Sequence, residues 1–203
     1  MEYLIIIAAA YLLGCSNMAL FISKCKDVDL SAAGSGNYGA SNATILLGWG
    51  AGVLTGIHDI GKAWLAVFLA KLLFPELVYA GAAAGVACVL GHIFPFYMGF
   101  KGGKGFASYL GMTIGLNWKL ALIVMVLVVV VTLITDYLVA GTTLTILSVP
   151  VYTGIAEKSL WLAVILCIAT AVILYKHRHN YVRIFKGTEI GLRSTAKGEH
   201  RVK

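Results

Sequence analysis

The sequence predicts an all-α integral membrane protein with about seven transmembrane helices, one of them short. Two observations carry this prediction. The 203 residues are 60% hydrophobic and only 12% charged, whereas a soluble domain has about 25% charged residues. Apolar stretches also recur along the chain, and most of them reach the roughly 20 residues that a helix needs to cross a bilayer. We therefore expect a single membrane domain over residues 1–203.

Six apolar stretches are long enough to span a membrane. They cover residues 3–23, 52–74, 77–97, 118–136, 138–156 and 159–175. A seventh stretch, residues 106–117, has only 12 residues. It suits a half-span or an interfacial helix, and it suits a full crossing only where the bilayer is thinned.

The positions of the basic residues favour a full crossing for the short stretch. Lys and Arg near the ends of spans collect on the cytoplasmic side of a membrane. Lys24 and Lys26 follow the first span, Lys101 and Lys104 follow the third, and eight of the 16 Lys and Arg residues come after residue 175. Only seven crossings place all three groups on one side, so we expect the N-terminus outside and the C-terminus in the cytoplasm. A basic segment that directly follows a span favours retention near anionic lipid over nucleic-acid binding.

The most informative motif is a loop of glycines and lysines between two apolar stretches. It reads Gly99-Phe100-Lys101-Gly102-Gly103-Lys104-Gly105 and is called the lysine loop below. Glycines let the backbone turn tightly and bring its N–H groups close to a ligand. The apolar residues that follow predict a helix N-terminus directly after the loop, where unpaired N–H groups and the helix dipole favour an anion. The motif therefore predicts a phosphate-binding site at the membrane surface.

A second polar segment, residues 24–50, is rich in small residues. Its centre reads Gly34-Ser35-Gly36-Asn37-Tyr38-Gly39-Ala40-Ser41-Asn42 and is called the glycine loop below. A flexible linker is one interpretation of such a composition. However, the segment is not a Gly/Ser repeat, and small polar groups on a tight backbone also suit the cradle of a ligand. Both interpretations are kept at this point.

Titratable residues inside the apolar stretches point to buried polar contacts. Asp59 and Lys62 lie three residues apart, on one face of the expected helix, and charged groups within a membrane normally pair with each other. This pair either is purely structural or holds the cytoplasmic loops in place, and His58 is read as a core histidine. Pro95 should end the third span, so His92 lies near the membrane boundary. There it serves either as a packing group or in proton transfer or oxygen binding.

The basic C-terminal segment opens with Tyr175-Lys176-His177-Arg178-His179-Asn180. A helix end with snorkelling basic side chains is one interpretation. If the helix continues past Tyr175, His177 and Asn180 share a face and can together hydrogen-bond a substrate hydroxyl or phosphate. No further ligand stands at a useful spacing from the histidines, and the four cysteines are far apart, so we expect no metal. Nor does any motif indicate an organic cofactor.

Taken together, these motifs resemble the PlsY family, the membrane acyl-phosphate:glycerol-3-phosphate acyltransferases. The matching blocks occur in the same order and at matching intervals over almost the whole chain. They are Gly34-Ser35-Gly36-Asn37, Gly39-Ala40-Ser41-Asn42, Asp59 and Lys62, Gly91-His92-Ile93-Phe94-Pro95, the lysine loop, His177-Arg178 with Asn180, and Lys186-Gly187-Thr188-Glu189.

The resemblance implies an enzyme of phospholipid synthesis in the bacterial inner membrane, with seven helices and its active site facing the cytoplasm. The implied reaction transfers a fatty acyl group from acyl phosphate to the 1-hydroxyl of glycerol 3-phosphate and yields lysophosphatidic acid and phosphate. It implies catalytic contacts to the phosphorylated substrates by Ser35, Lys104, His177 and Asn180. A wider set is implied to bind substrate: Gly34, Gly36, Asn37, Ser41, Asn42, His92, Lys101, Gly102 and Gly103.

The chain also departs from the family pattern. Most members have arginine where this chain has Ser31 and Ile45, and a basic residue is frequent where Trp49 stands. Because a guanidinium group is the strongest ordinary clamp for phosphate, two alternatives stay open. Either other cations such as Arg178 or Arg183 compensate, or the chain is a weak or inactive homologue that binds phosphate ligands or takes another polyol phosphate. A transporter of organic phosphates is a third class, favoured by the intramembrane charges.

Overall fold

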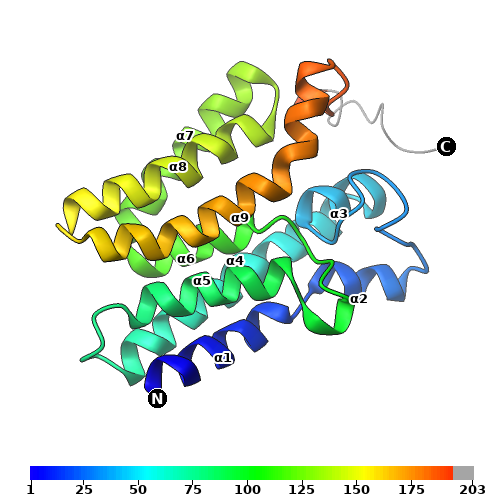
Figure 1. The fold of residues 1–203 in the computed structure, drawn as a ribbon. Helices are drawn as coiled ribbons and strands as arrows, with labels where there is room; N and C mark the ends of the chain where they lie inside the picture. Colours follow the sequence, from blue (N-terminus) through cyan, green and yellow to red (C-terminus); the bar gives the residue numbers. More distant parts are fainter. Residues whose placement is uncertain (194–203) are drawn as a thin grey trace. The chain divides into compact units, whose positions relative to one another are not determined.

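The computed structural model describes residues 1–193, which form helices joined by loops (Figure 1). The helices are α1 (Glu2–Cys15), α2 (Met18–Cys25), α3 (Ala40–Leu47), α4 (Trp49–Leu73), α5 (Ala80–Ile93), the 3₁₀ helix η1 (Phe96–Met98), α6 (Phe106–Leu116), α7 (Trp118–Thr135), α8 (Leu138–Ala156) and α9 (Leu160–Phe185). Six helical segments within these residues are long and apolar enough to span a membrane, and α6 is a shorter apolar helix. The all-α membrane fold with one short helix is therefore confirmed. Lys197, Arg201 and Lys203, which belong to the predicted basic C-terminal segment, lie outside the described residues.

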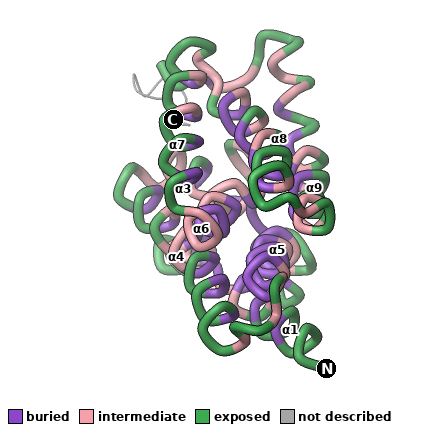
Figure 2. The backbone as a smooth tube through the Cα atoms, turned by 90° about the vertical axis from the view of Figure 1, so that its left-hand side faces the viewer, coloured by how far each residue is buried: buried purple, intermediate pink, exposed green. Residues whose placement is uncertain are grey.

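The chain divides into two compact units, the first covering Met1–Leu116 and the second beginning at Asn117. In the first unit, α5 is the central helix: it packs against α1, α4 and α6, and most of its residues are buried (Figure 2). Its alanines and glycines let neighbouring backbones come close, as is common where membrane helices meet. A Cβ on Gly91 would lie 2.2 Å from the carbonyl oxygen of Tyr11, and one on Gly14 of α1 would lie 2.1 Å from that of Cys88. Larger residues at these glycines would force α1 and α5 apart.

The first predicted span is interrupted at Ser16 and Asn17, which the apolar pattern did not predict. Ser16 has the extended backbone angles φ −56° and ψ 133°. Asn17 caps the new helix α2, because its side-chain oxygen accepts a hydrogen bond from the Leu20 amide at 2.8 Å. In an unbroken helix that amide would bond to the Ser16 carbonyl. The break therefore leaves the Ser16 carbonyl available to another donor.

The polar segment 24–50 also contains a helix that the sequence did not predict, the eight-residue α3. It packs against α4, where a Cβ on Gly52 would lie 1.8 Å from the hydroxyl oxygen of Thr44. Gly48, with φ +93°, separates α3 from α4. The glycine loop is thus held between two anchored helices, which argues against a flexible linker.

The second unit consists of α7, α8, α9 and the residues that follow α9. Helix α8 packs against α7 and α9, and the Thr170 hydroxyl of α9 donates to the Ile146 carbonyl of α8 at 2.8 Å. Helix α9 continues ten residues past Tyr175, to Phe185, so His177 and Asn180 do lie on one helix face. After α9 the chain returns to the end of α7, where the Leu192 and Arg193 amides donate to the backbone and side chain of Asp136, respectively, at 2.8 and 2.9 Å. Asp136 therefore anchors the segment that carries Glu189.

Candidate active site

The lysine loop connects α5 to α6 as the sequence predicts. Helix α5 ends at Ile93, Pro95 precedes η1, and α6 begins at Phe106 directly after the loop. Gly105, with φ +96°, accepts the first helical hydrogen bond of α6, from the Tyr109 amide at 2.8 Å. Lys104, half-buried, immediately precedes this helix start. The loop thus presents a lysine at a helix N-terminus, an arrangement that attracts an anion.

The lysine loop is fastened to the end of α5 by its two central glycines. The Gly102 amide donates to the Ile93 carbonyl at 3.1 Å, and the Gly103 amide donates to the His92 carbonyl at 3.2 Å. A Cβ on Gly102 would lie 2.1 Å from the His92 carbonyl oxygen, and a Cβ on Gly103 would lie 2.1 Å from His92 Nε2. Both glycines are therefore required by close packing on His92, and this packing fixes where the loop lies.

The glycine loop is held from beneath by Asn42, which is fully buried. The Asn42 side-chain oxygen accepts from the Ser35 amide at 2.8 Å. Its nitrogen donates to the carbonyls of Leu30 at 2.8 Å and of Asn37 at 2.9 Å. Since these bonds occupy both ends of the amide, Asn42 fixes the shape of the loop, and its role in substrate binding stays a prediction.

Ser35 and Asn37 lie together on the glycine loop. The Asn37 side-chain nitrogen donates to the Ser35 hydroxyl oxygen at 2.8 Å, which orients the hydroxyl proton toward another acceptor. Gly34 and Gly36, at φ +62° and +63°, provide the left-handed turns on either side of Ser35, a conformation that other residues adopt rarely. Ser41 is exposed in the first turn of α3.

The two loops meet within the first unit. A Cβ built on Gly39 of the glycine loop would lie 4.0 Å from the Cα atom of Gly103 in the lysine loop. The structure therefore brings together the two segments that the sequence singled out, although they are more than 50 residues apart in the chain. The same built Cβ would lie 3.0 Å from the side-chain oxygen of Asn37, so this side chain also lies near the meeting point of the loops.

Asp59, Lys62 and His92 form a buried cluster next to the lysine loop. Lys62 Nζ is 2.9 Å from Asp59 Oδ1 and 3.1 Å from His92 Nδ1, and His92 Nδ1 is 3.2 Å from Asp59 Oδ1. At most 5% of any of these three residues is exposed. The predicted pairing of Asp59 with Lys62 is confirmed. The proximity of His92 to this pair was not predicted, because it depends on how α4 packs against α5.

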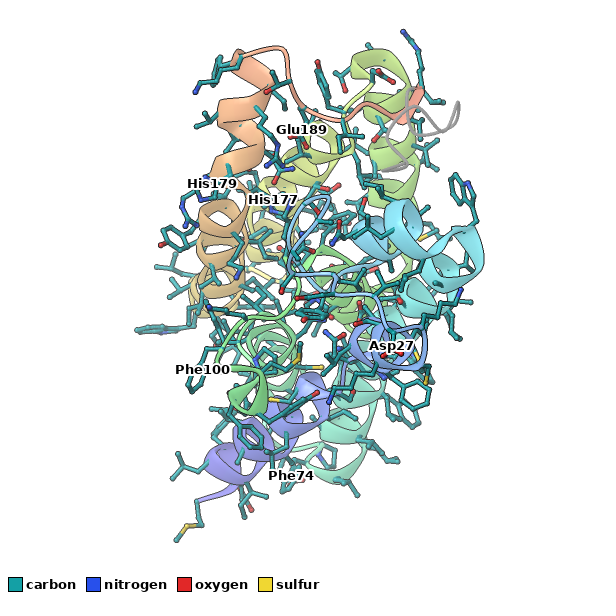
Figure 3. All side chains as sticks on the ribbon, turned by 90° about the vertical axis from the view of Figure 1, so that its right-hand side faces the viewer. Asp27, Phe74, Phe100, His177, His179 and Glu189 are labelled. Carbon is teal, nitrogen blue, oxygen red and sulfur yellow. The ribbon has the colours of Figure 1, made fainter. Side chains whose placement is uncertain are left out.

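In the second unit, His177 and Asn180 of α9 are buried, whereas His179 is exposed. Figure 3 shows the two histidines on this helix. His177 Nδ1 is 2.9 Å from the Ile173 carbonyl oxygen. A carbonyl can only accept, so Nδ1 carries the proton and neutral His177 has its lone pair on Nε2. Asn180 donates to Glu189 Oε1, a residue whose place beside Asn180 the sequence did not indicate. His177 is thus oriented as a hydrogen-bond or proton acceptor.

Arg178 and Arg183, the two cations that could compensate for the missing arginines, both lie on α9. Arg183 Nε donates to Glu189 Oε2 at 2.6 Å, so its charge is already compensated. The Arg178 guanidinium lies 4.0 Å from the centre of the Tyr175 ring and donates to the Tyr175 carbonyl at 2.9 Å. Both guanidinium groups thus have partners within the second unit.

Three positions at which the family pattern has a basic residue and this chain does not, Ser31, Ile45 and Trp49, lie on or near α3 in the sequence. Ser31 is exposed, and its amide and hydroxyl donate to Asp29 Oδ1 at 2.8 and 2.7 Å. These hydrogen bonds lower the pKa of the Asp29 carboxyl group. Ile45 is half-buried on α3, and Trp49 is exposed at the start of α4. Lys26 Nζ donates to the Leu47 carbonyl at 3.4 Å, so a cation does lie at the C-terminal end of α3.

Residues 1–193 contain no group of three or more His, Cys, Asp or Glu side chains that could hold a metal ion. The arrangement instead offers lysines, backbone amides and small polar groups, which suit an anionic substrate.

We expect the amide of Asn42 to be essential to the glycine loop. Asn42→Leu, which keeps the side-chain size, should lower the free energy of unfolding by about 2–4 kcal/mol, because several buried backbone groups lose their partners. Thermal unfolding of the purified variant in detergent measures this loss. Thr44→Val is the matched control, since the Thr44 hydroxyl bonds only within α3. Equal melting temperatures for the two variants would contradict this account of the loop.

Comparison with known proteins gives one consistent result. Residues 4–187 match the family model described as glycerol-3-phosphate acyltransferase. A curated glycerol-3-phosphate acyltransferase of Coxiella burnetii is 36% identical over 190 residues, which cover 93% of this chain and 97% of the relative. Two crystal structures of PlsY, an integral membrane glycerol 3-phosphate acyltransferase, are also similar. The glycerol 3-phosphate form has a TM-score of 0.90 at 31% identity and covers 97% of this chain and 98% of the other. The lysophosphatidic acid form has a TM-score of 0.85 at 31% identity, with 94% and 95% covered.

Proposed function

The chain belongs to the glycerol-3-phosphate acyltransferase family, and we propose that it transfers a fatty acyl group from acyl phosphate to the 1-hydroxyl of glycerol 3-phosphate. This membership confirms the resemblance to the PlsY family that the motifs indicated. The observation that supports the proposal most strongly is the meeting of the glycine loop with the lysine loop at Gly39 and Gly103. That junction gathers anion-binding groups at one end of a membrane-spanning bundle, where a lipid substrate and a charged one can both reach them.

The chemistry needs electrostatics and positioning more than a nucleophilic side chain. The acceptor hydroxyl oxygen forms a bond to the acyl carbonyl carbon, the bond from that carbon to the phosphate oxygen breaks, and phosphate leaves with the electron pair. Two anionic substrates must be held together, and well-oriented proximity alone supplies up to roughly 7–11 kcal/mol of the barrier. Lys101 and Lys104 would reduce the repulsion between the two substrates and stabilise the negative charge on the departing phosphate. The hydroxyl proton has two kinds of acceptor, a histidine of the chain or a phosphate oxygen of the donor.

The roles of individual residues are part of the proposal. We propose that Ser35, Lys104, His177 and Asn180 contact the phosphorylated substrates. The orientation of the Ser35 hydroxyl by Asn37 and the protonation of His177 at Nδ1 support these roles. Lys101 and the loop glycines would bind substrate as well. With Nδ1 protonated, His177 would accept a substrate hydroxyl at Nε2.

The membrane topology is a proposal as well. We infer that the protein lies in the bacterial inner membrane with the N-terminus outside and the C-terminus inside, so that the active site faces the cytoplasm and the acyl chain stays in the lipid. This orientation is supported by the basic residues near the ends of the spans, which are Lys24, Lys26, Lys101, Lys104 and those that follow Tyr175.

The donor class can be tested in membranes from cells that express the chain. Labelled glycerol 3-phosphate should be converted to lysophosphatidate when acyl phosphate is added. Acyl-CoA of the same chain length is the matched control and should not support the reaction. Conversion with acyl-CoA alone would contradict the proposed donor.

A weak or altered acceptor site is the second candidate, and the hydrophobic residue at position 45 favours it. Ile45→Arg should lower the KM for glycerol 3-phosphate by about tenfold or more, because a charged contact to phosphate contributes a few kcal/mol. Ile45→Gln, similar in length but neutral, serves as the control. If both variants behave like the wild type, phosphate is not bound next to residue 45, and other polyol phosphates should be tried as acceptors.

A further inference from the structure

We propose that Asp59, Lys62 and His92 are positioning residues that hold the lysine loop in its place beside the glycine loop. Their anchor is the break in the first span at Ser16 and Asn17. The consequence for catalysis rests on the proposed function, whereas the consequence for the loop does not.

The first step is the contact between Lys62 and the helix break. Lys62 Nζ donates to the Ser16 carbonyl at 2.6 Å. If α1 continued unbroken, this carbonyl would accept the helical hydrogen bond from the Leu20 amide. It is released because the Asn17 side chain takes the Leu20 amide instead. His58 Nε2 lies 3.3 Å from the Ser16 hydroxyl oxygen, so α4 contacts the break twice. The break therefore provides the polar groups that α4 contacts.

The second step leads from the cluster to the lysine loop through the two edges of one ring. His92 Nδ1 faces Lys62 and Asp59, at 3.1 and 3.2 Å. The opposite ring nitrogen, Nε2, lies against Gly103, where a Cβ would come within 2.1 Å. The angle at which Asp59 and Lys62 hold the ring therefore decides where Gly103 lies, and with it the neighbouring Lys104.

The third step links the same break to the glycine loop. The Asn17 side-chain nitrogen donates to the Tyr38 carbonyl at 3.2 Å, one residue before Gly39. Ser16 and Asn17 are adjacent, so one break is joined to the lysine loop through Lys62 and His92 and to the glycine loop directly. The spacing of the two loops follows from these joined contacts.

The cluster is also an unusual choice if its purpose is stability alone. Charged groups within a membrane are expensive to bury, and apolar side chains of similar volume often stabilise a core as well or better. Apolar side chains in place of Asp59 and Lys62 would lack the directional contacts that fix the angle of the His92 ring.

The test removes both charges together and follows the lysine loop. In the double variant Asp59→Asn, Lys62→Met, no unpaired charge is left buried. Hydrogen–deuterium exchange of the purified full chain should show about tenfold faster exchange in the peptide that contains the Gly102 and Gly103 amides. The KM for glycerol 3-phosphate should rise by about tenfold to a hundredfold, with a smaller change in kcat, since a misplacement of about 1 Å has effects of this size. Thr113→Val, which removes another buried hydroxyl of the first unit, should leave both values unchanged.

The outcomes separate the cluster from the function. Unchanged exchange in the lysine loop overturns the positioning role, whatever the activity. Faster exchange in a chain whose wild type shows no acyl transfer supports the cluster and overturns the proposed function. If the double variant does not fold, Gly103→Ala displaces the His92 ring from the loop side, with Gly61→Ala, which faces open space, as its control. Equal loop exchange in these two alanine variants would also overturn the proposal.

Discussion

Replacement of Lys104 by alanine is expected to reduce acyl transfer by at least about a hundredfold, the typical effect of removing one group that stabilises developing charge. Lys104 immediately precedes the N-terminus of α6 and follows the two glycines that pack on His92. We propose that its ammonium group acts with the helix dipole on one phosphate. Turnover of the purified variant, measured as lysophosphatidate formed from acyl phosphate and glycerol 3-phosphate, tests this expectation.

Two further variants serve as controls for the Lys104→Ala result. Lys119→Ala removes a charge from an exposed lysine that packs on Trp118, and it should retain full activity and the same melting temperature. Lys104→Arg keeps the charge and should recover part of the lost activity, as the guanidinium differs in shape. A folded Lys104→Ala protein with undiminished turnover would contradict a role for this lysine in catalysis.

Replacement of Lys62 alone should have the largest effect on stability. Lys62→Met leaves the Asp59 carboxylate buried without its cation, and breaking a buried pair in this way lowers the free energy of unfolding by about 3–5 kcal/mol. The contact from Lys62 to the Ser16 carbonyl is lost as well. Thermal or denaturant unfolding in a mild detergent measures the loss.

The paired substitution shows whether the loss comes from the unpaired charge. In Asp59→Asn, Lys62→Met the carboxylate is removed too, so much of the stability should return even though the lysine loop loosens. A single Lys62→Met variant as stable as the wild type would contradict this expectation and would mean that other neighbours, such as His92 at 3.2 Å, compensate the Asp59 charge.

Sequence reasoning predicted the elements whose signals are local. Runs of apolar residues marked the membrane helices, Pro95 marked the end of α5, and the lysine loop marked the start of α6 at Phe106. The break at Ser16 was missed because two polar residues do not alter the mean hydropathy of a span. The signal that could have revealed it is Asn17 directly before a new helical turn, where it is a favoured cap.

The parts of the site that the sequence did not predict depend on contacts between distant residues. The approach of His92 to Lys62 requires the small residues of α5 to bring neighbouring helices close together. The bond from Asn180 to Glu189 requires the chain to return after α9, which the anchor at Asp136 makes possible. No regular spacing in the sequence indicates either contact. Glu189 does belong to one of the blocks that resemble the family, but that block does not place it beside Asn180. The single domain predicted for residues 1–203 stays a prediction.

The measurement that tests the central claim most directly is phosphate release by the purified protein from acyl phosphate, with and without glycerol 3-phosphate. We expect release to depend on the acceptor and to be matched by an equal amount of lysophosphatidate, identified by its mass. Release that is the same without the acceptor, or that yields no lysophosphatidate, would contradict the assignment of this chain as a glycerol-3-phosphate acyltransferase.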